Sequence, residues 1–164
     1  MNFIFDSSTL ILLAKIDILR SVAEEVKIRI PKRVKDECTV KDTFDAKIIL
    51  SLIKEGLIMV KGDGSTGAVN KLCKDFKIHH GEAEALYLAI KEECPLAVDD
   101  GPTIKACKIL NIRFATAIHF LIIMLDKGKL SRQMATAKLE KLSLLGRYNR
   151  WIIENAIKRL EGGI

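Results

Sequence analysis

Short apolar runs alternate along this chain with longer segments of helical spacing, and that alternation limits its fold more than any other feature. The runs at 2–5, 26–31, 57–61 and 95–98 are each too short for a helix and end at polar or turn-forming residues. Parallel strands buried on both faces have this appearance when helices connect them. The pattern therefore predicts an α/β protein with a central parallel sheet.

Helical spacing of apolar side chains links these runs and continues to the C-terminus. A helix over 7–19 is expected to take Ser7 or Ser8 as its N-cap, and a helix over 41–55 ends at Gly56, which suits a C-cap. Further helices are expected over 31–38, 70–76, 82–93, 102–110, 118–125, 132–145 and 148–160, with a short strand over 112–116.

The composition is that of one folded domain. Of the 164 residues 49% are hydrophobic and 29% are charged, and three prolines with no Gly/Ser-rich run leave no sign of a linker. We expect a single domain over residues 1–164, in which residues 130–164 form a C-terminal helical extension.

The longest apolar segment, 114–125, is shorter than the roughly 20 residues that a membrane span needs. Asp6 interrupts the only apolar run near the N-terminus, so that run does not resemble a signal peptide. We expect no membrane partner and a cytoplasmic location. The hydrophobicity of 114–125 instead favours a buried helix or the interface of a homodimer.

The charge balance favours anionic partners, with nucleic acid ahead of a membrane surface. Lysine and arginine outnumber aspartate and glutamate by 27 to 21, which gives a net charge of +6. The four cysteines are far apart and form no CxxC or Cys/His cluster, so reduced thiols are expected and structural zinc is not.

Carboxylates directly follow two of the apolar runs. Asp6 follows the run at 2–5, and Asp99 and Asp100 follow the run at 95–98. Ligands of parallel sheets bind beyond the carboxyl ends of the strands, so these acids are candidates for one site. Asp6 and Asp100 could equally cap the helices that follow them. Adjacent acids such as Asp99 and Asp100 repel each other unless a cation, a basic group or water separates them.

Helix geometry separates the two glutamates of the segment HHGEAEALYLAI at 79–90. At about 100° per residue, Glu82 lies within about 60° of the centre of the apolar face, and Glu84 points almost directly away from it. We therefore expect Glu84 in solvent and Glu82 turned inward, unless Glu82 merely complements the helix dipole. The apolar face consists of Ala85, Leu86, Ala89 and Ile90.

The remaining candidates are less constrained by their spacing. Glu37 lies three residues after Val34 and is either inward-facing with it or an outer charge. The histidines are not spaced as ligands with any of the acids, so His79 and His80 are expected in a loop and His119 in the core.

Carboxylates without histidine or cysteine form a hard oxygen site, which selects Mg²⁺ or Mn²⁺ over zinc. Beside a basic surface, such a site favours metal-assisted hydrolysis of phosphodiesters. The segment GDGSTG at 62–67 lacks the GK[ST] ending of a phosphate-binding loop, which disfavours a nucleoside-triphosphate enzyme.

Four segments in this order resemble the PIN-domain nucleases: FDSSTLILLAKID, IPKRVKDE, GEAEALYLA and AVDDGPTIKACKILNI. The likeness is strongest to a small prokaryotic, especially archaeal, branch in which a GEAEA helix and a DD strand end recur. It covers most of the chain, including the tail at 139–160. The resemblance implies a three-layer α/β/α fold and a metal-dependent nuclease that acts mostly on RNA. Many such proteins are homodimers, and many are toxins of toxin–antitoxin pairs.

The resemblance also implies a set of site residues. The expected metal ligands are Asp6, Glu82 and Asp100, with Asp99 beside it, and the acid of the second motif is Glu37. Ser7 or Ser8 would hold Asp6 or the attacking water by a hydrogen bond. Two departures concern substrate contacts: Gly101-Pro102-Thr103 replaces an arginine-rich segment, and TAIHFL at 116–121 replaces a glycine-bearing turn.

We therefore expect an endoribonuclease that uses Mg²⁺ or Mn²⁺ and cleaves RNA. An antitoxin protein is the partner expected for a toxin, and the chain is expected to form a homodimer. The alternative is a PIN-like module with weakened catalysis that binds RNA or a protein.

Overall fold

The computed structural model describes residues 1–162 and places five parallel strands in one sheet. The strand order is β3-β2-β1-β4-β5, so β1 lies at the centre and pairs with β2 on one side and β4 on the other. The predicted α/β class is confirmed. The strands are β1 (Asn2–Phe5), β2 (Lys27–Pro31), β3 (Ile58–Lys61), β4 (Leu96–Ala97) and β5 (Phe114–Ala115).

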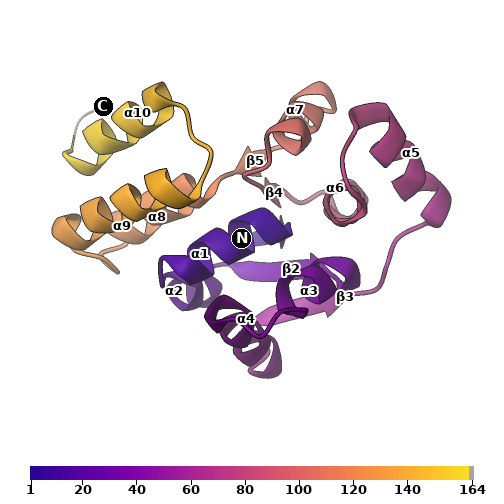
Figure 1. Ribbon diagram of the computed structural model, residues 1–164, viewed down its shortest axis with the longest axis horizontal. Coiled ribbons are helices and arrows are strands. Elements are labelled where there is room, and N and C mark those ends of the chain that lie inside the picture. Colours follow the sequence, from indigo (N-terminus) through magenta and orange to yellow (C-terminus); the bar gives the residue numbers. More distant parts are fainter. Residues whose placement is uncertain (163–164) are drawn as a thin grey trace.

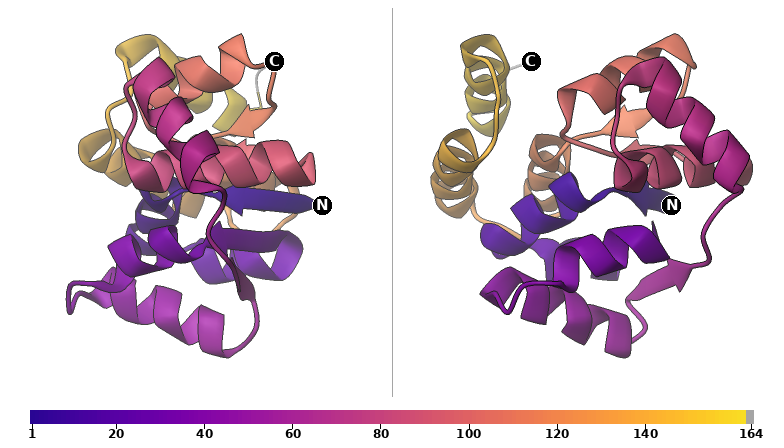
Figure 2. Two further views of the ribbon diagram at one scale, coloured as in Figure 1. Left: turned by 90° about the vertical axis from the view of Figure 1, so that its right-hand side faces the viewer. Right: turned by 45° about the vertical axis from the view of Figure 1, so that its right-hand side comes forward.

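Helices lie on both sides of this sheet and complete a three-layer α/β/α arrangement (Figures 1 and 2). Helices connect each strand to the next one along the chain, as parallel strands require a crossover connection. The helices are α1 (Ser7–Lys15), α2 (Leu19–Glu25), α3 (Lys32–Thr39), α4 (Phe44–Lys54), α5 (Thr66–Phe76), α6 (His80–Glu92), α7 (Gly101–Ile109), α8 (Ala117–Asp126), α9 (Arg132–Leu145) and α10 (Arg150–Leu160).

The pairing of β1 with β4 determines where the acids meet. Ile4 is in register with Leu96 and Phe5 with Ala97, and the amide of Asp6 donates to the carbonyl of Ala97 over 3.0 Å. The residues that follow the two strands therefore emerge at the same edge of the sheet.

Several helix boundaries differ from the expected ones. The segment 7–19 is not one helix, because Asp17 adopts a φ of 60° and separates α1 from a second helix, α2. The N-cap of α1 is Asp6 and neither of the two serines. Helix α5 begins at Thr66, which is earlier than expected, whereas Gly56 has the positive φ of 78° that suits the residue after a helix.

The apolar segment 114–125 is buried within the protomer. Phe120, Leu121 and Met124 of α8 are fully buried, and α9 and α10 both pack against α8. These two helices lie side by side at one edge of the molecule (Figure 2). Much of the apolar surface of the segment is thus covered within one chain, although Phe114, Ile122 and Ile123 are only partly buried. No helix within residues 1–162 is both long and apolar enough to cross a membrane.

Candidate active site at the carboxyl edge of the sheet

Asp6 directly follows β1 and is almost completely buried, with 1% of its surface exposed. Its Oδ1 atom accepts a hydrogen bond from the Ser8 hydroxyl at 2.6 Å and another from the Thr9 amide at 3.2 Å. The second bond caps α1, as an aspartate at this position commonly does. The capping function and a place in the acid site are therefore compatible.

The other oxygen of Asp6, Oδ2, is buried and has no hydrogen-bond partner among the described residues. The pKa of Asp6 is raised from 3.8 to about 8: burial is the main cause, the nearby carboxylates of Asp99 and Glu82 contribute, and the hydrogen bonds of Ser8 and Thr9 oppose the rise. An unsatisfied buried carboxylate oxygen is costly and calls for an explanation, such as a bound ion.

Ser8 connects the ends of the two central strands. Its hydroxyl donates to Asp6 and accepts from the amide of Asp99 at 3.0 Å. Of the two serines considered from the sequence, Ser8 is therefore the one that holds Asp6. Ser7 lies instead beside Glu37 and lowers the pKa of that carboxyl.

Asp99 is the most fully hydrogen-bonded acid of the group. Its Oδ2 accepts from the Thr9 hydroxyl at 2.7 Å and from the Ala117 amide at 3.0 Å, and its Oδ1 accepts from the hydroxyl of Tyr148. Burial raises its pKa, and these donors oppose that shift. Since both oxygens are engaged, Asp99 joins the end of β4 to α1, α8 and the turn before α10.

Asp100 caps α7 through one oxygen only. Its Oδ2 accepts from the amide of Thr103 at 3.0 Å and from the hydroxyl of Thr103 at 2.7 Å. Pro102 in the first turn is well placed, because its missing amide hydrogen has no partner in a helix there. The Gly101-Pro102-Thr103 departure thus builds a stable helix start around Asp100.

The sequence suggests two roles for Glu82, an inward-facing acid and a charge that supports the helix start, and the structure shows both. It lies at the third position of α6, and its Oε2 accepts from the amide of His79 at 2.8 Å, which supports the helix N-terminus. It is also half-buried and lines the cleft beside Asp100. Burial raises its pKa, and the charges of Asp100 and Glu37 add to that increase.

The predicted solvent position of Glu84 is wrong. Glu84 is buried, with 6% of its surface exposed, and its Oε2 accepts from the amide of Gly64 at 2.9 Å. Helix α6 is covered by α3, α5 and α7 as well as by the sheet, so it has no single apolar face. Ile90, which the helical periodicity assigned to the apolar face, is 45% exposed.

Glu37 extends from α3 toward the first turn of α6. A Cβ atom on Gly81 would lie 2.2 Å from both carboxylate oxygens of Glu37, so only glycine permits this approach. The carboxylate is partly desolvated there, which raises its pKa. Glu37 therefore faces the helix that carries Glu82, although the residue as a whole is exposed.

The prediction of a core position for His119 is also wrong. The side chain is exposed at the edge of the cleft, and its Nδ1 accepts from the amide of Thr116 at 3.0 Å. Loss of solvation lowers its pKa, while the charge of Asp99 raises it. The imidazole is thus a neutral acceptor near the N-terminus of α8.

The five predicted acids lie toward one edge of the sheet, where the charges of their neighbours raise the pKa of Asp6 and of Glu82. Three of them line a cleft of about 1050 Å³. As the side chains stand, no three acidic, histidine or cysteine groups within residues 1–162 are arranged to hold one ion. The predicted acids that line it are Glu82, Asp99 and Asp100, and Asp126 of α8 lines it as well.

Three residues that position these acids were missed from the sequence. Thr9 and Tyr148 donate to Asp99, and Thr103 donates to Asp100. Thr9 follows the aspartate and the two serines directly, and this proximity could have drawn attention to it. Tyr148 is 49 residues from Asp99, and nothing in its local sequence indicates the contact.

Comparison with solved structures finds similarity to the crystal structure of PAE2754 from Pyrobaculum aerophilum, at 17% sequence identity and a TM-score of 0.49. The alignment covers 71% of this chain and 92% of that one. No curated protein sequence matches the chain. Residues 2–161, nearly the whole length, match the family described as PIN domain, whose members are generally nucleases, and the chain therefore belongs to the PIN-domain family.

Proposed function

We propose that this protein is an endoribonuclease that depends on a divalent cation, Mg²⁺ or Mn²⁺. The observation that carries the proposal is the buried, unpartnered Oδ2 of Asp6 at the edge where the other carboxylates gather. A bound cation would offset both the missing partner and the mutual repulsion of these groups.

The donor set suits such an ion chemically. The ligands would be Asp6, Glu82 and Asp100, all of which offer the hard oxygen atoms that Mg²⁺ and Mn²⁺ select. Glu82 and Asp100 each use one carboxylate oxygen for a helix cap and retain a second oxygen. Asp99, with both oxygens occupied by hydrogen bonds, is better suited to positioning its neighbours than to binding the ion.

Cation chemistry at this edge would supply an activated water and stabilise the charge that develops on the phosphate. The protein's own residues would do the rest. Ser8 and Thr9 hold the Asp6 carboxylate in place, and Glu37, whose pKa is raised, suits a group that accepts a proton from the attacking water.

The substitution Asp6→Asn tests the proposal with little change in shape. We expect cleavage of single-stranded RNA in Mn²⁺ or Mg²⁺ to fall by more than the ~10- to 100-fold that supporting residues of a metal site typically cost. The rise in Tm on adding Mn²⁺ should disappear as well. The exposed Asp75→Asn is the control and should retain both. Full cleavage by folded Asp6→Asn protein would exclude the assignment.

The RNA preference rests on the surplus of basic residues and on the family. A matched single-stranded DNA should be cleaved more slowly than RNA. If calorimetry detects no binding of Mg²⁺ or Mn²⁺, a module that binds RNA or protein without cleavage becomes the better description.

We also propose that the protein is a toxin, that it is cytoplasmic and that it forms a homodimer. A toxin would be encoded beside a short reading frame for its antitoxin, and co-expression of the two should suppress cleavage. Light scattering tests the homodimer, for which the burial of α8 weakens the argument from hydrophobicity.

A further inference from the structure

The cleft beside the acids extends well beyond them and has a wall from the C-terminal helices. Residues of α1 line it at intervals of three and four, from Ser8 to Lys15. At about 1.5 Å per residue, this stripe continues the cleft roughly 10 Å along α1. The opposite wall comes from the turn before α10 and from α10 itself, between Tyr148 and Arg159.

Trp151 is the most prominent apolar group of this wall. It lines the cleft and remains 69% exposed, although a large aromatic side chain is normally buried. It lies three residues after Tyr148, whose hydroxyl contacts Asp99. The indole is therefore displayed close to the acid edge.

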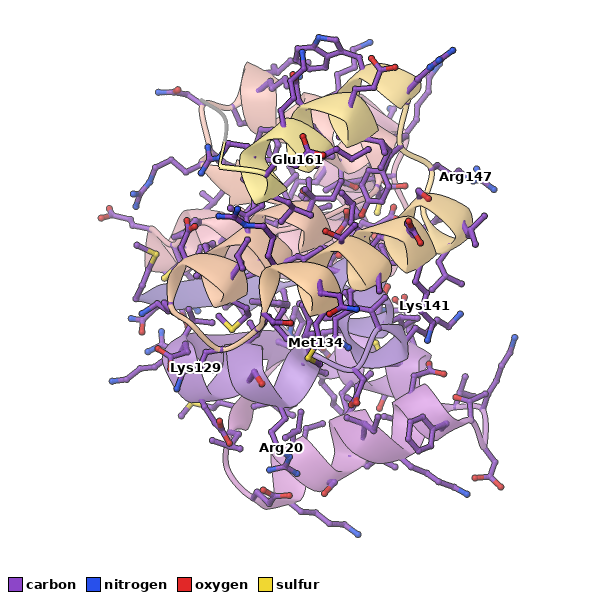
Figure 3. The ribbon with its side chains drawn as sticks, turned by 90° about the vertical axis from the view of Figure 1, so that its left-hand side faces the viewer. Arg20, Lys129, Met134, Lys141, Arg147 and Glu161 are labelled. Atoms are coloured by element: carbon purple, nitrogen blue, oxygen red, sulfur yellow. The ribbon has the colours of Figure 1, made fainter. Side chains whose placement is uncertain are left out.

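Basic side chains accompany this tryptophan around the cleft. Figure 3 shows Arg147 at the turn between α9 and α10, on the side of the molecule that these helices cover. Within residues 1–162, none of the basic lining residues is within 4 Å of a carboxylate, so their charges are available. These residues are Lys15, Lys108, Arg147 and Arg159.

We propose that α10 forms part of the substrate-binding surface, with Trp151 as a platform on which an RNA base stacks. Lys15, Lys108, Arg147 and Arg159 would contact the phosphates that flank that base. This inference rests on the proposed function for the identity of the strand, and it assigns the C-terminal extension a role in holding it.

The combination of groups favours a single strand over other occupants. Aromatic platforms with basic neighbours bind unpaired bases, since every base has a face to stack and every nucleotide a phosphate. The rest of the lining is largely apolar, including Ile122, Ile123 and Ile152, which suits base and sugar surfaces. In a duplex the faces of the bases are already stacked, so a duplex cannot use the platform.

The chain offers a direct optical test, because Trp151 is its only tryptophan. In EDTA, where cleavage is prevented, titration of the wild-type protein with a single-stranded RNA of about a dozen nucleotides should quench the fluorescence. A duplex of the same sequence should quench it much less. Absence of quenching by the single strand, or equal quenching by the duplex, would overturn the proposal.

Substitution separates stacking from simple proximity. Trp151→Ala should weaken binding of the single strand by about 5- to 150-fold, as loss of one stacked base does, whereas Trp151→Phe should keep most of the affinity. Leu144→Ala is the control, because Leu144 is 86% exposed on α9 and does not line the cleft. Equal affinities for Trp151→Ala and Leu144→Ala would contradict a platform.

The phosphate contacts have their own signature in salt. Arg159→Gln should make the slope of log affinity against log salt about 0.7 shallower, the value for one phosphate of a single strand. Arg132→Gln, an exposed residue of α9 outside the cleft, should leave the slope unchanged. Unchanged slopes for both variants would remove the phosphate contact from the proposal.

These results are independent of the nuclease activity. RNA that quenches Trp151 but is not cleaved in Mn²⁺ would support the platform and contradict the proposed catalysis. Cleavage that occurs with the same KM in wild type and Trp151→Ala, without quenching, would overturn the platform and retain the nuclease.

Discussion

Burial dominates the behaviour of Asp6, and either a proton or a bound cation reduces the cost of burying its charge. The carboxylate loses its solvation, gains two donors on one oxygen and gains none on the other. An apolar side chain at this position would avoid the cost of desolvating a carboxylate, so the aspartate is not explained by stability alone. This cost is what a role for Asp6 in the proposed site would account for.

This state makes stability depend on pH. With a pKa raised from 3.8 to about 8, folded Asp6 keeps a proton that the unfolded chain has lost, so stability falls as pH rises through that window. The slope from this group is up to about 1.4 kcal/mol per pH unit. Urea unfolding in EDTA should show the decline in wild type and a flatter profile in Asp6→Asn. Parallel profiles would contradict the shift.

Glu84 shows the opposite case of an acid with a purely structural contact. Glu84→Ala removes the acceptor for the Gly64 amide and should cost about 1–3 kcal/mol of unfolding free energy. Mn²⁺ should raise the Tm of this variant as it does that of wild type. The exposed Glu140→Ala should stay within about 0.5 kcal/mol in the same urea titration. A cost no larger than that of the control would show that the buried bond contributes nothing.

Among the elements, the sequence predicts those with a strong local signal. Strand β1 and helices α6, α8 and α9 lie close to where the apolar spacing places them. Strand β4 is only two residues long, and α2 is separated from α1 by a single positive φ at Asp17. The apolar spacing predicts neither the length of β4 nor the break between α1 and α2.

The same distinction applies to the site. Strand ends and helix caps can be read locally, which is why the sequence predicts Asp6, Asp100 and Glu82 as candidates for the site. Glu84 was misplaced because periodicity describes a helix with one buried face, and α6 is covered on nearly all sides. Tyr148 could not be found, since its contact with Asp99 joins distant segments.

The close approach of the Glu37 carboxylate to α6 depends on one glycine. Gly81→Ala should not lower Tm, because alanine favours helix over glycine by about 1 kcal/mol, but its methyl group would displace the Glu37 carboxylate. We expect a loss of RNA cleavage similar to that of Glu37→Gln. Retained cleavage in Gly81→Ala alongside its loss in Glu37→Gln would show that the close approach is not required.

At the scale of the whole molecule, the C-terminal helices pack against α8 and cover part of its apolar surface. Leu142 of α9 is fully buried, while Leu144 of the same helix is 86% exposed. Leu142→Ala should cost about 2–5 kcal/mol of unfolding free energy, and Leu144→Ala close to nothing. Urea titration of the two variants measures the difference. Equal effects would mean that α9 contributes little to the fold.

In the sheet, with strand order β3-β2-β1-β4-β5, the first part of the chain forms β1 to β3 and the second part adds β4 and β5. The predicted acids come from both parts. Asp6 and Glu37 come from the part that builds three adjacent strands, and Glu82, Asp99 and Asp100 come from the part that adds the other two. The set is therefore complete only when β4 has paired with β1. A fragment that ends after β3 could still form the three strands β3, β2 and β1, but it would carry only Asp6 and Glu37 of the five acids that the proposed site requires.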